Sequence, residues 1–323
     1  LAGRFRFALQ GEFAVEGLAV YVDVSIGIAL CPDVATDVEG LLQRADIAMY
    51  QAKSDRVGAV VFEAGDADLT ARLTGVEELR HAIDEEQLVL HYQPKVALAT
   101  GELTGVEALV RWQHPERGLL TPGVFLPQAE RYGFMRPLTT WVLRTALDRV
   151  QDWRTGGGPP NVAVNVTASN LLDTDLPDQI ADMLAVRGLT GDALTVEITE
   201  DLLMVDTRRA SHVLHSLRLL GVGVSIDDYG TGYSSLARLR DLPVTELKLD
   251  RSFIANIEHD PRTAEIVRST VQLTHSLGLL LVAEGVETSA ALELLREMGC
   301  DTRQGYHLGR PAPAPRAPHP AQT

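Results

Sequence analysis

From Leu88 onward, short apolar runs alternate with segments long enough to form amphipathic helices. All of these runs except the last have the length and the Val, Ile and Leu content of a buried strand. The runs are Leu88–Tyr92, Val106–Arg111, Val162–Val166, Leu194–Ile198, Val222–Ile226, Glu246–Leu249, Leu279–Val282 and a weaker one at Asp301–Gly305. The helical segments are Leu138–Trp153, Pro177–Ala185, Thr207–Leu220, Tyr233–Leu239, Pro261–Ser276 and Ser289–Met298. Eight strands and intervening helices over roughly 230 residues predict an α/β fold of the (β/α)8 barrel type.

The first connection in this series departs from a regular barrel. Ala97–Gly105 is too short to contain the crossover helix that two parallel strands require. We therefore expect the first two strands of the barrel to pair antiparallel.

The amino-terminal part has a different pattern, typical of an α+β segment. An alternating strand lies within Gly17–Leu30, Asp37–Lys53 has helical spacing, and Val57–Phe62 reads as a returning strand. Roughly 60 residues form only a marginal core, so we expect part of a domain here, cut from a longer protein. The predicted division is an α+β remnant at 1–65, a connecting helix at 66–83, the barrel at 84–311 and a disordered Pro/Ala-rich tail at 312–323.

Charge and cysteine content narrow the functional class. The formal net charge of −15 has the wrong sign for passive binding to a nucleic acid polymer or an anionic membrane, so we expect neither partner. Two cysteines exclude a disulfide scaffold and favour a reducing, cytoplasmic location. The longest apolar run, Leu279–Ala283, is far below the ~20 residues of a membrane span, although regions ahead of residue 1 could anchor the longer protein.

Polar side chains stand at or near the carboxyl ends of seven of the predicted strands. They are Glu107, Asn165, Glu197, Asp227, Asp228, Lys248, Glu284 and Gln304. In a barrel these ends meet at one mouth, where catalytic groups project. A strand that is buried on both faces tolerates a carboxylate only when it is paired or bound to a metal. Lys248 is notable because the chain has three lysines and otherwise uses Arg as its cation.

Carboxylates that lie together need cations, because like charges raise each other's pKa. An all-oxygen donor set favours Mg²⁺ or Mn²⁺ over zinc. The adjacent Asp227 and Asp228 suggest two ions, the usual device for in-line displacement at phosphorus. These residues predict metal-dependent phosphoester chemistry.

A series of motifs adds a family resemblance. They are Glu107-Ala108-Leu109 extended by Arg111, Tyr92-Gln93-Pro94, Phe125-Leu126-Pro127, Asn165, Glu197-Ile198-Thr199-Glu200, Asp227–Gly232, Lys248-Leu249-Asp250, Glu284-Gly285-Val286-Glu287 and Gln304-Gly305-Tyr306. In order and spacing, they resemble the EAL-domain cyclic di-GMP phosphodiesterases from about Leu88 to Pro311. The resemblance implies a TIM-like barrel with one antiparallel strand, two Mg²⁺ or Mn²⁺ ions, and hydrolysis of cyclic di-GMP to linear pGpG.

The resemblance also implies roles for individual residues and a homodimer formed through the barrel. The implied metal ligands are Glu107, Asn165, Glu197, Asp227, Asp228 and Glu284, with Lys248, Glu284 and Gln304 acting on the attacking water. The implied dinucleotide contacts are Gln93, Leu109, Arg111 and Asp250, whereas Glu200 and Glu287 would support the loop at Asp228–Tyr233.

Two motifs near the amino terminus resemble the carboxyl half of a GGDEF (diguanylate cyclase) domain. They are Ser25–Ala29 and Ala45–Lys53. The signature loop of that family would lie ahead of residue 1, so this chain is expected to lack cyclase activity.

Two other functional classes stay open. A non-catalytic receptor for cyclic di-GMP would have no need for the complete set of predicted metal and water-positioning residues. A barrel lyase or isomerase could use Mg²⁺ with Lys248 and Asp250 on an enolisable acid. A preference for the dinucleotide would argue against that lyase.

Overall fold

The computed structural model describes residues 12–15, 18–21, 24–54, 58–62, 78–85, 87–200, 207–231 and 236–314. The chain divides into two compact units. One unit comprises residues 1–85 together with 123–134, and the other comprises 86–122 together with 135–323.

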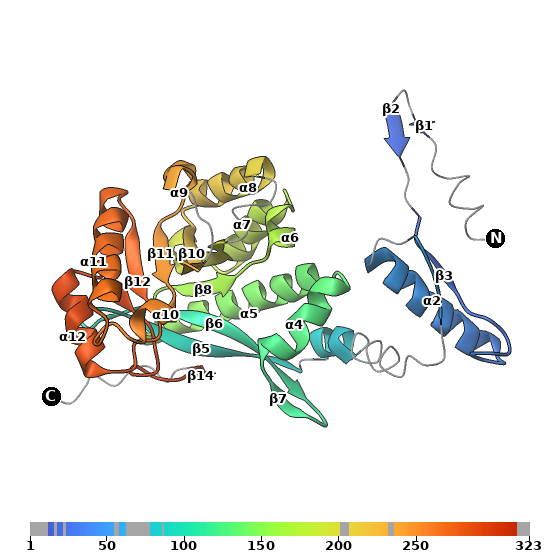
Figure 1. Cartoon of the computed structure of the whole chain (residues 1–323), viewed down its shortest axis with the longest axis horizontal. Coiled ribbons are helices and arrows are strands. Elements are labelled where there is room, and N and C mark those ends of the chain that lie inside the picture. The colour runs from blue at the N-terminus through green and yellow to red at the C-terminus, as the bar shows by residue number, and fades with distance from the viewer. Residues whose placement is uncertain are drawn as a thin grey trace. The chain divides into compact units, whose positions relative to one another are not determined.

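The second unit is a closed barrel of eight strands surrounded by helices (Figure 1). Its strands are β5 (Leu88–Ala97), β6 (Leu103–His114), β8 (Val162–Asn165), β9 (Leu194–Thr199), β10 (Gly223–Tyr229), β11 (Glu246–Leu249), β12 (Leu280–Ala283) and β13 (Thr302–Arg303). Neighbours from β6 through β13 pair in parallel, in chain order. The barrel predicted from the alternating pattern is thereby confirmed.

Strand β5 closes the barrel and runs against both of its neighbours. It pairs antiparallel with β6 from Leu88 to Val96 and with β13 at Val96 and Ala97. The five-residue link to β6 turns at Gly101, whose φ of 73° suits glycine. The expected antiparallel start is thus confirmed, and it follows from a link that is too short for a helix.

The remaining elements of the second unit cover the barrel or extend its edges. They are β7 (Gly118–Leu120), α5 (Met135–Gly156), α6 (Ala168–Leu171), α7 (Leu176–Val186), η1 (Gly191–Ala193), α8 (Thr207–Leu219), α9 (Leu236–Asp241), α10 (Arg251–Ile254), α11 (Pro261–Ser276), α12 (Ser289–Met298) and β14 (Ala312–Pro313). The strand core is apolar: Val162, Ala163 and Val164 of β8 are fully buried. This packed core fixes the strand ends on which the polar side chains stand.

The predicted tail needs one correction. Disorder is expected from residue 312, yet Ala312 and Pro313 form β14 and pair antiparallel with Tyr92 and His91 of β5. Because β13 covers only the last residues of β5, the earlier part of that edge has open backbone groups, and β14 pairs there. Residues 315–323 lie outside the described part of the chain.

The first unit contains the small α+β segment. Its elements are β1 (Glu12–Val15), β2 (Leu18–Tyr21), β3 (Ile26–Ile28), α2 (Val38–Ser54), β4 (Ala59–Val61) and α4 (Pro122–Arg131), of which Pro122 belongs to the other unit. Strands β3 and β4 pair in parallel, as a crossover through α2 requires. Of the predicted connecting helix at 66–83, residues 78–83 are helical, and the rest lies outside the described residues. In the described regions no helix has both the length and the apolarity to cross a membrane.

Candidate active site

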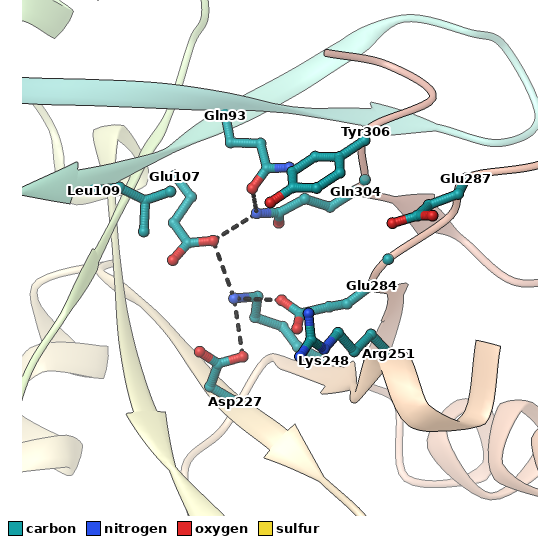
Figure 2. Close-up of a pocket in the computed structure, with 12 residues that line it drawn as sticks. Gln93, Glu107, Leu109, Asp227, Lys248, Arg251, Glu284, Glu287, Gln304 and Tyr306 are labelled. Carbon is teal, nitrogen blue, oxygen red and sulfur yellow. Dashed lines mark hydrogen bonds and ion pairs between the residues drawn. The ribbon is translucent and has the colours of Figure 1, made fainter. Parts of the chain in front are cut away.

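The polar residues predicted at the strand ends do meet at the carboxyl end of the barrel. Glu107 comes from β6, Glu197 from β9 and Lys248 from β11, and all three side chains are buried. Glu284 and Gln304 directly follow β12 and β13. Figure 2 shows Glu107, Lys248, Glu284 and Gln304 converging on one pocket. Parallel strands place their ends at one rim, which is why residues far apart in sequence become neighbours.

The Lys248 ammonium lies at the centre of the acidic cluster, and its side chain is 1% exposed. Its Nζ is 2.7 Å from Glu284 Oε1, 2.9 Å from Asp227 Oδ1, 3.0 Å from Glu197 Oε2 and 3.3 Å from Glu107 Oε2. Burial alone would lower the pKa of Lys248, but the four carboxylates outweigh it and raise that pKa well above its usual value. The lysine is therefore a fixed positive charge.

One ammonium does not balance all of these acids. Burial favours the neutral form of Glu107, but Lys248 and hydrogen bonds from Gln304 and Asn165 lower its pKa to about 2. For Glu284, burial raises the pKa to about 7 despite the attraction of Lys248. Burial and the charge on Glu107 likewise raise the pKa of Glu197. The site carries more negative charge than its own cations neutralise, a condition that favours binding of further cations.

Two groups of carboxylates are close enough to share a cation. Glu107, Glu197 and Asp227 form the first, and Asp227, Asp228 and Glu284 form the second, with the oxygens of each group within 4.8 Å of one another. Asp227 belongs to both, as the adjacent aspartates suggested. Asn165 donates from Nδ2 to Glu107 Oε1 at 2.8 Å, so its amide oxygen is the atom left to bind a cation. This all-oxygen donor set fits Mg²⁺ or Mn²⁺.

The carboxyl end of β10 holds Asp228 in an unusual conformation. Asp228 has a φ of 54°, in the left-handed region that aspartate tolerates better than most residues. Its amide donates to Asp227 Oδ1 at 3.0 Å, and its carbonyl accepts from the Thr231 hydroxyl at 2.9 Å. Gly230 N–H donates to Glu200 Oε2 at 2.8 Å, which agrees with the expected support from Glu200. Local bonds on both sides thus hold the strained residue in place.

A pocket of about 200 Å³ opens beside the acids. Gln304 donates from Nε2 to Glu107 Oε2 at 2.5 Å and to Gln93 Oε1 at 3.1 Å (Figure 2). These bonds link the residue after β13 to strands β6 and β5. Leu109 and Glu287 also line the pocket. Glu287 was expected to support the loop at Asp228–Tyr233, but the structure places it in the pocket lining. Part of that loop lies outside the described residues.

The structure does not bring two predicted ligand contacts to the pocket wall. Arg111 donates from Nη1 to the carbonyl of its neighbour Val110 at 2.8 Å. Asp250 caps α10 by accepting the Ser252 amide at 3.0 Å. Neither lines the pocket, and their contact with a ligand stays a prediction.

The pocket wall and the barrel interior also contain residues that the sequence analysis did not assign. Arg251 and Tyr306 line the pocket; Arg251 directly follows the motif Lys248-Leu249-Asp250, and Tyr306 ends the motif Gln304-Gly305-Tyr306, in which it was given no role. Lys95 lies inside the barrel and pairs with Glu246. The rarity of lysine was a usable signal, because the argument that marked Lys248 among three lysines extends to Lys95, three residues beyond the predicted run Leu88–Tyr92.

Comparison with known families matches residues 76–311 to the EAL domain and residues 3–58 to "Diguanylate cyclase, GGDEF domain". MucR of Pseudomonas aeruginosa, a "Bifunctional diguanylate cyclase/cyclic di-GMP phosphodiesterase", is 45% identical over 97% of this chain and 46% of its own length. NbdA of the same species, a "Cyclic di-GMP phosphodiesterase", is 42% identical over 97% of this chain and 40% of its own length. The chain thus spans less than half of each of these curated relatives.

Solved structures agree with the barrel. The structure titled "PaMucR Phosphodiesterase, c-di-GMP complex" has a TM-score of 0.71 and 46% identity, and the match covers 75% of this chain and 98% of that one. An EAL domain protein from Listeria monocytogenes EGD-e has a TM-score of 0.66 and 35% identity, over 74% and 94% of the two chains. The closed barrel, its acid-lined mouth and the match over residues 76–311 show that this chain belongs to the EAL domain family.

Proposed function

We propose that this chain hydrolyses one phosphodiester bond of cyclic di-GMP and releases linear pGpG. The observation that carries the proposal is the pair of carboxylate groups that share Asp227 beside a pocket at the barrel mouth. Relatives named as cyclic di-GMP phosphodiesterases, and a solved relative in complex with the dinucleotide, support this substrate.

Glu107, Glu197 and Asp227 would hold one divalent cation, and Asp227, Asp228 and Glu284 the second. Bound there, Mg²⁺ or Mn²⁺ would offset charge on the phosphate and lower the pKa of a water. The chain's own residues provide orientation. Lys248 is a fixed ammonium that can donate hydrogen bonds to the attacking oxygen and offset the negative charge that develops in the transition state.

The pocket walls would hold the dinucleotide. Gln304 and Gln93 present amide groups that can orient the water and bind a phosphate or base edge, respectively. Arg251 adds a guanidinium that suits a phosphate, and Tyr306 adds a half-exposed aromatic ring that suits stacking on a base. An acidic protein thus gains cationic and polar contacts where an anionic ligand would bind.

The test is chromatography of cyclic di-GMP incubated with the purified chain and Mn²⁺ or Mg²⁺. We expect pGpG from the parent and from Glu102→Gln, an exposed glutamate in the turn between β5 and β6. Glu107→Gln, which keeps the side-chain shape, is expected to lose at least about 100-fold in rate because a ligand charge is lost. Dinucleotide binding without product from any variant would instead identify a receptor, the alternative left open by the sequence.

The homodimer and the choice between Mg²⁺ and Mn²⁺ stay predictions of the family resemblance. Light scattering of the purified chain, with and without cyclic di-GMP, measures whether the homodimer forms. Rates of cyclic di-GMP hydrolysis after removal of metal by EDTA and readdition of Mg²⁺ or Mn²⁺ measure which ion the chain uses.

A further inference from the structure

A second polar layer lies inside the barrel, one step further from the mouth than the acidic cluster. Gln93 of β5 is level with Glu107, so Lys95, two residues on and level with Gly105, lies deeper. Ser225 of β10 is in register with Glu197 of β9 on one side and with Glu246 of β11 on the other. Glu197 and Glu246 therefore lie two strands apart with Ser225 between them. A packed barrel core is normally apolar at this depth, which makes a buried lysine there a feature to be explained.

Lys95 contacts two carboxylates from different strands. Its Nζ is 3.0 Å from Glu246 Oε1 and 3.5 Å from Glu197 Oε1, and its side chain is 4% exposed. Within the described part of the chain, Glu197 Oε1 accepts no hydrogen bond, so the ammonium is its polar partner.

The other oxygen of Glu197 has a different environment. Oε2 is 3.0 Å from Lys248 Nζ and 3.5 Å from Asn165 Nδ2, among the groups that meet at the mouth. The two oxygens of this fully buried carboxylate are therefore divided between two cations: Lys95 below and Lys248 above. That division fixes which oxygen is available to an ion at the mouth.

We propose that Lys95 is a positioning residue that holds Glu197 Oε1 within the barrel so that Oε2 alone faces the cation site. This inference rests on the proposed function. Groups that orient a metal ligand commonly change metal affinity about 10- to 100-fold when they are removed.

A competing explanation is that Lys95 only neutralises Glu246. The two explanations predict different results for a variant that removes both charges. Lys95→Met alone is not decisive, because losing a positive charge near the site also favours cation binding. Lys95→Met/Glu246→Gln keeps the local net charge of the parent while depriving Glu197 of its partner. Glu246→Gln alone is the matched control, since it retains the contact between Lys95 and Glu197.

The experiment is a Mn²⁺ titration of the parent, the control and the double variant, with free Mn²⁺ followed by electron paramagnetic resonance. Thermal unfolding of each chain in EDTA checks the fold. We expect the double variant to bind Mn²⁺ about 10- to 100-fold more weakly than both the parent and Glu246→Gln. Parent-like affinity in the double variant would overturn the inference and leave the proposed function intact. A parent that binds no Mn²⁺ would overturn the proposed function itself.

Should the double variant not fold, a crystal structure of the parent with Mn²⁺ tests the same geometry. We expect Glu197 to bind the ion through Oε2 only, with Oε1 still on the Lys95 ammonium. An ion bound through Oε1, or through both oxygens, would contradict the proposed role.

Discussion

At the scale of single residues, Lys248 carries the electrostatic balance of the barrel mouth. Four carboxylates approach one buried ammonium, and a buried charge that loses its partner costs about 3–5 kcal/mol. We therefore expect metal-free Lys248→Met to be less stable than the parent by about that amount. Mn²⁺ should raise the Tm of this variant more than that of the parent, because ions would replace the missing positive charge.

Calorimetry in EDTA and in Mn²⁺ measures both effects. Arg268→Met, which removes a half-exposed cation from α11, is the control and should change neither. An equal Tm in EDTA for the two variants would show that Lys248 does not balance the acids.

The two cysteines should differ sharply in reactivity. Burial raises the pKa of Cys300 to about 12, so at pH 8 only about one thiol in 10⁴ is in the reactive thiolate form. Cys31 is exposed. We expect a thiol reagent at pH 8 to label one cysteine rapidly in the folded chain and both cysteines in denaturant. Cys31→Ser should abolish the rapid labelling of the folded chain. The rate at which the reagent labels Cys300 should rise about tenfold per pH unit below pH 12. Rapid labelling of both cysteines in the folded chain at pH 8 would contradict the prediction.

At the scale of elements, the end of β10 depends on Gly230. Its φ of 100° is unfavourable for any residue with a side chain, and an added Cβ would lie 2.7 Å from Phe253 Cε2. Gly230→Ala should therefore displace the end of β10 that carries Asp228, at a cost of about 1–3 kcal/mol. Mn²⁺ should also bind more weakly, because Asp228 belongs to one of the two carboxylate groups that could hold a cation.

Gly123→Ala in α4 is the matched control, because an added Cβ there meets nothing within 4 Å. Chemical denaturation with parallel Mn²⁺ titration measures both effects. Equal stability and affinity in the two variants would show that the loop adapts freely.

The barrel strands are the elements that the sequence predicted best. Apolar runs located seven of the eight barrel strands, the weaker run Asp301–Gly305 located β13, and a short link predicted the antiparallel β5. The two-residue β14 was missed, because its pairing depends on an open edge of β5 that periodicity does not reveal. The layer containing Lys95 was missed because register across the barrel, rather than spacing along the chain, brings Lys95 to Glu197. Arg111 and Asp250 bind the backbone instead of lining the pocket, a choice that motifs cannot predict.

At the scale of the whole molecule, the barrel has its own core and closes on itself without the first unit's strands. The match to a solved relative covers 75% of this chain and 98% of that one, as expected for a barrel that stands alone. We expect residues 84–323 to unfold in one cooperative transition and to retain the Mn²⁺ affinity of the full chain. Circular dichroism during heating and a Mn²⁺ titration test this. A molten shortened chain would show that the barrel needs residues 1–83.

The reversed β5 has a consequence for protein engineering. Leu88 pairs with Trp112 near the carboxyl end of β6, so the chain enters the barrel on the side of the mouth. In an all-parallel barrel, the first strand would begin at the opposite end. A fluorophore or crosslinking group placed just ahead of Leu88 would therefore report on the rim that carries the acidic cluster. The amino end of this barrel is a natural attachment point for a sensor of events at the pocket.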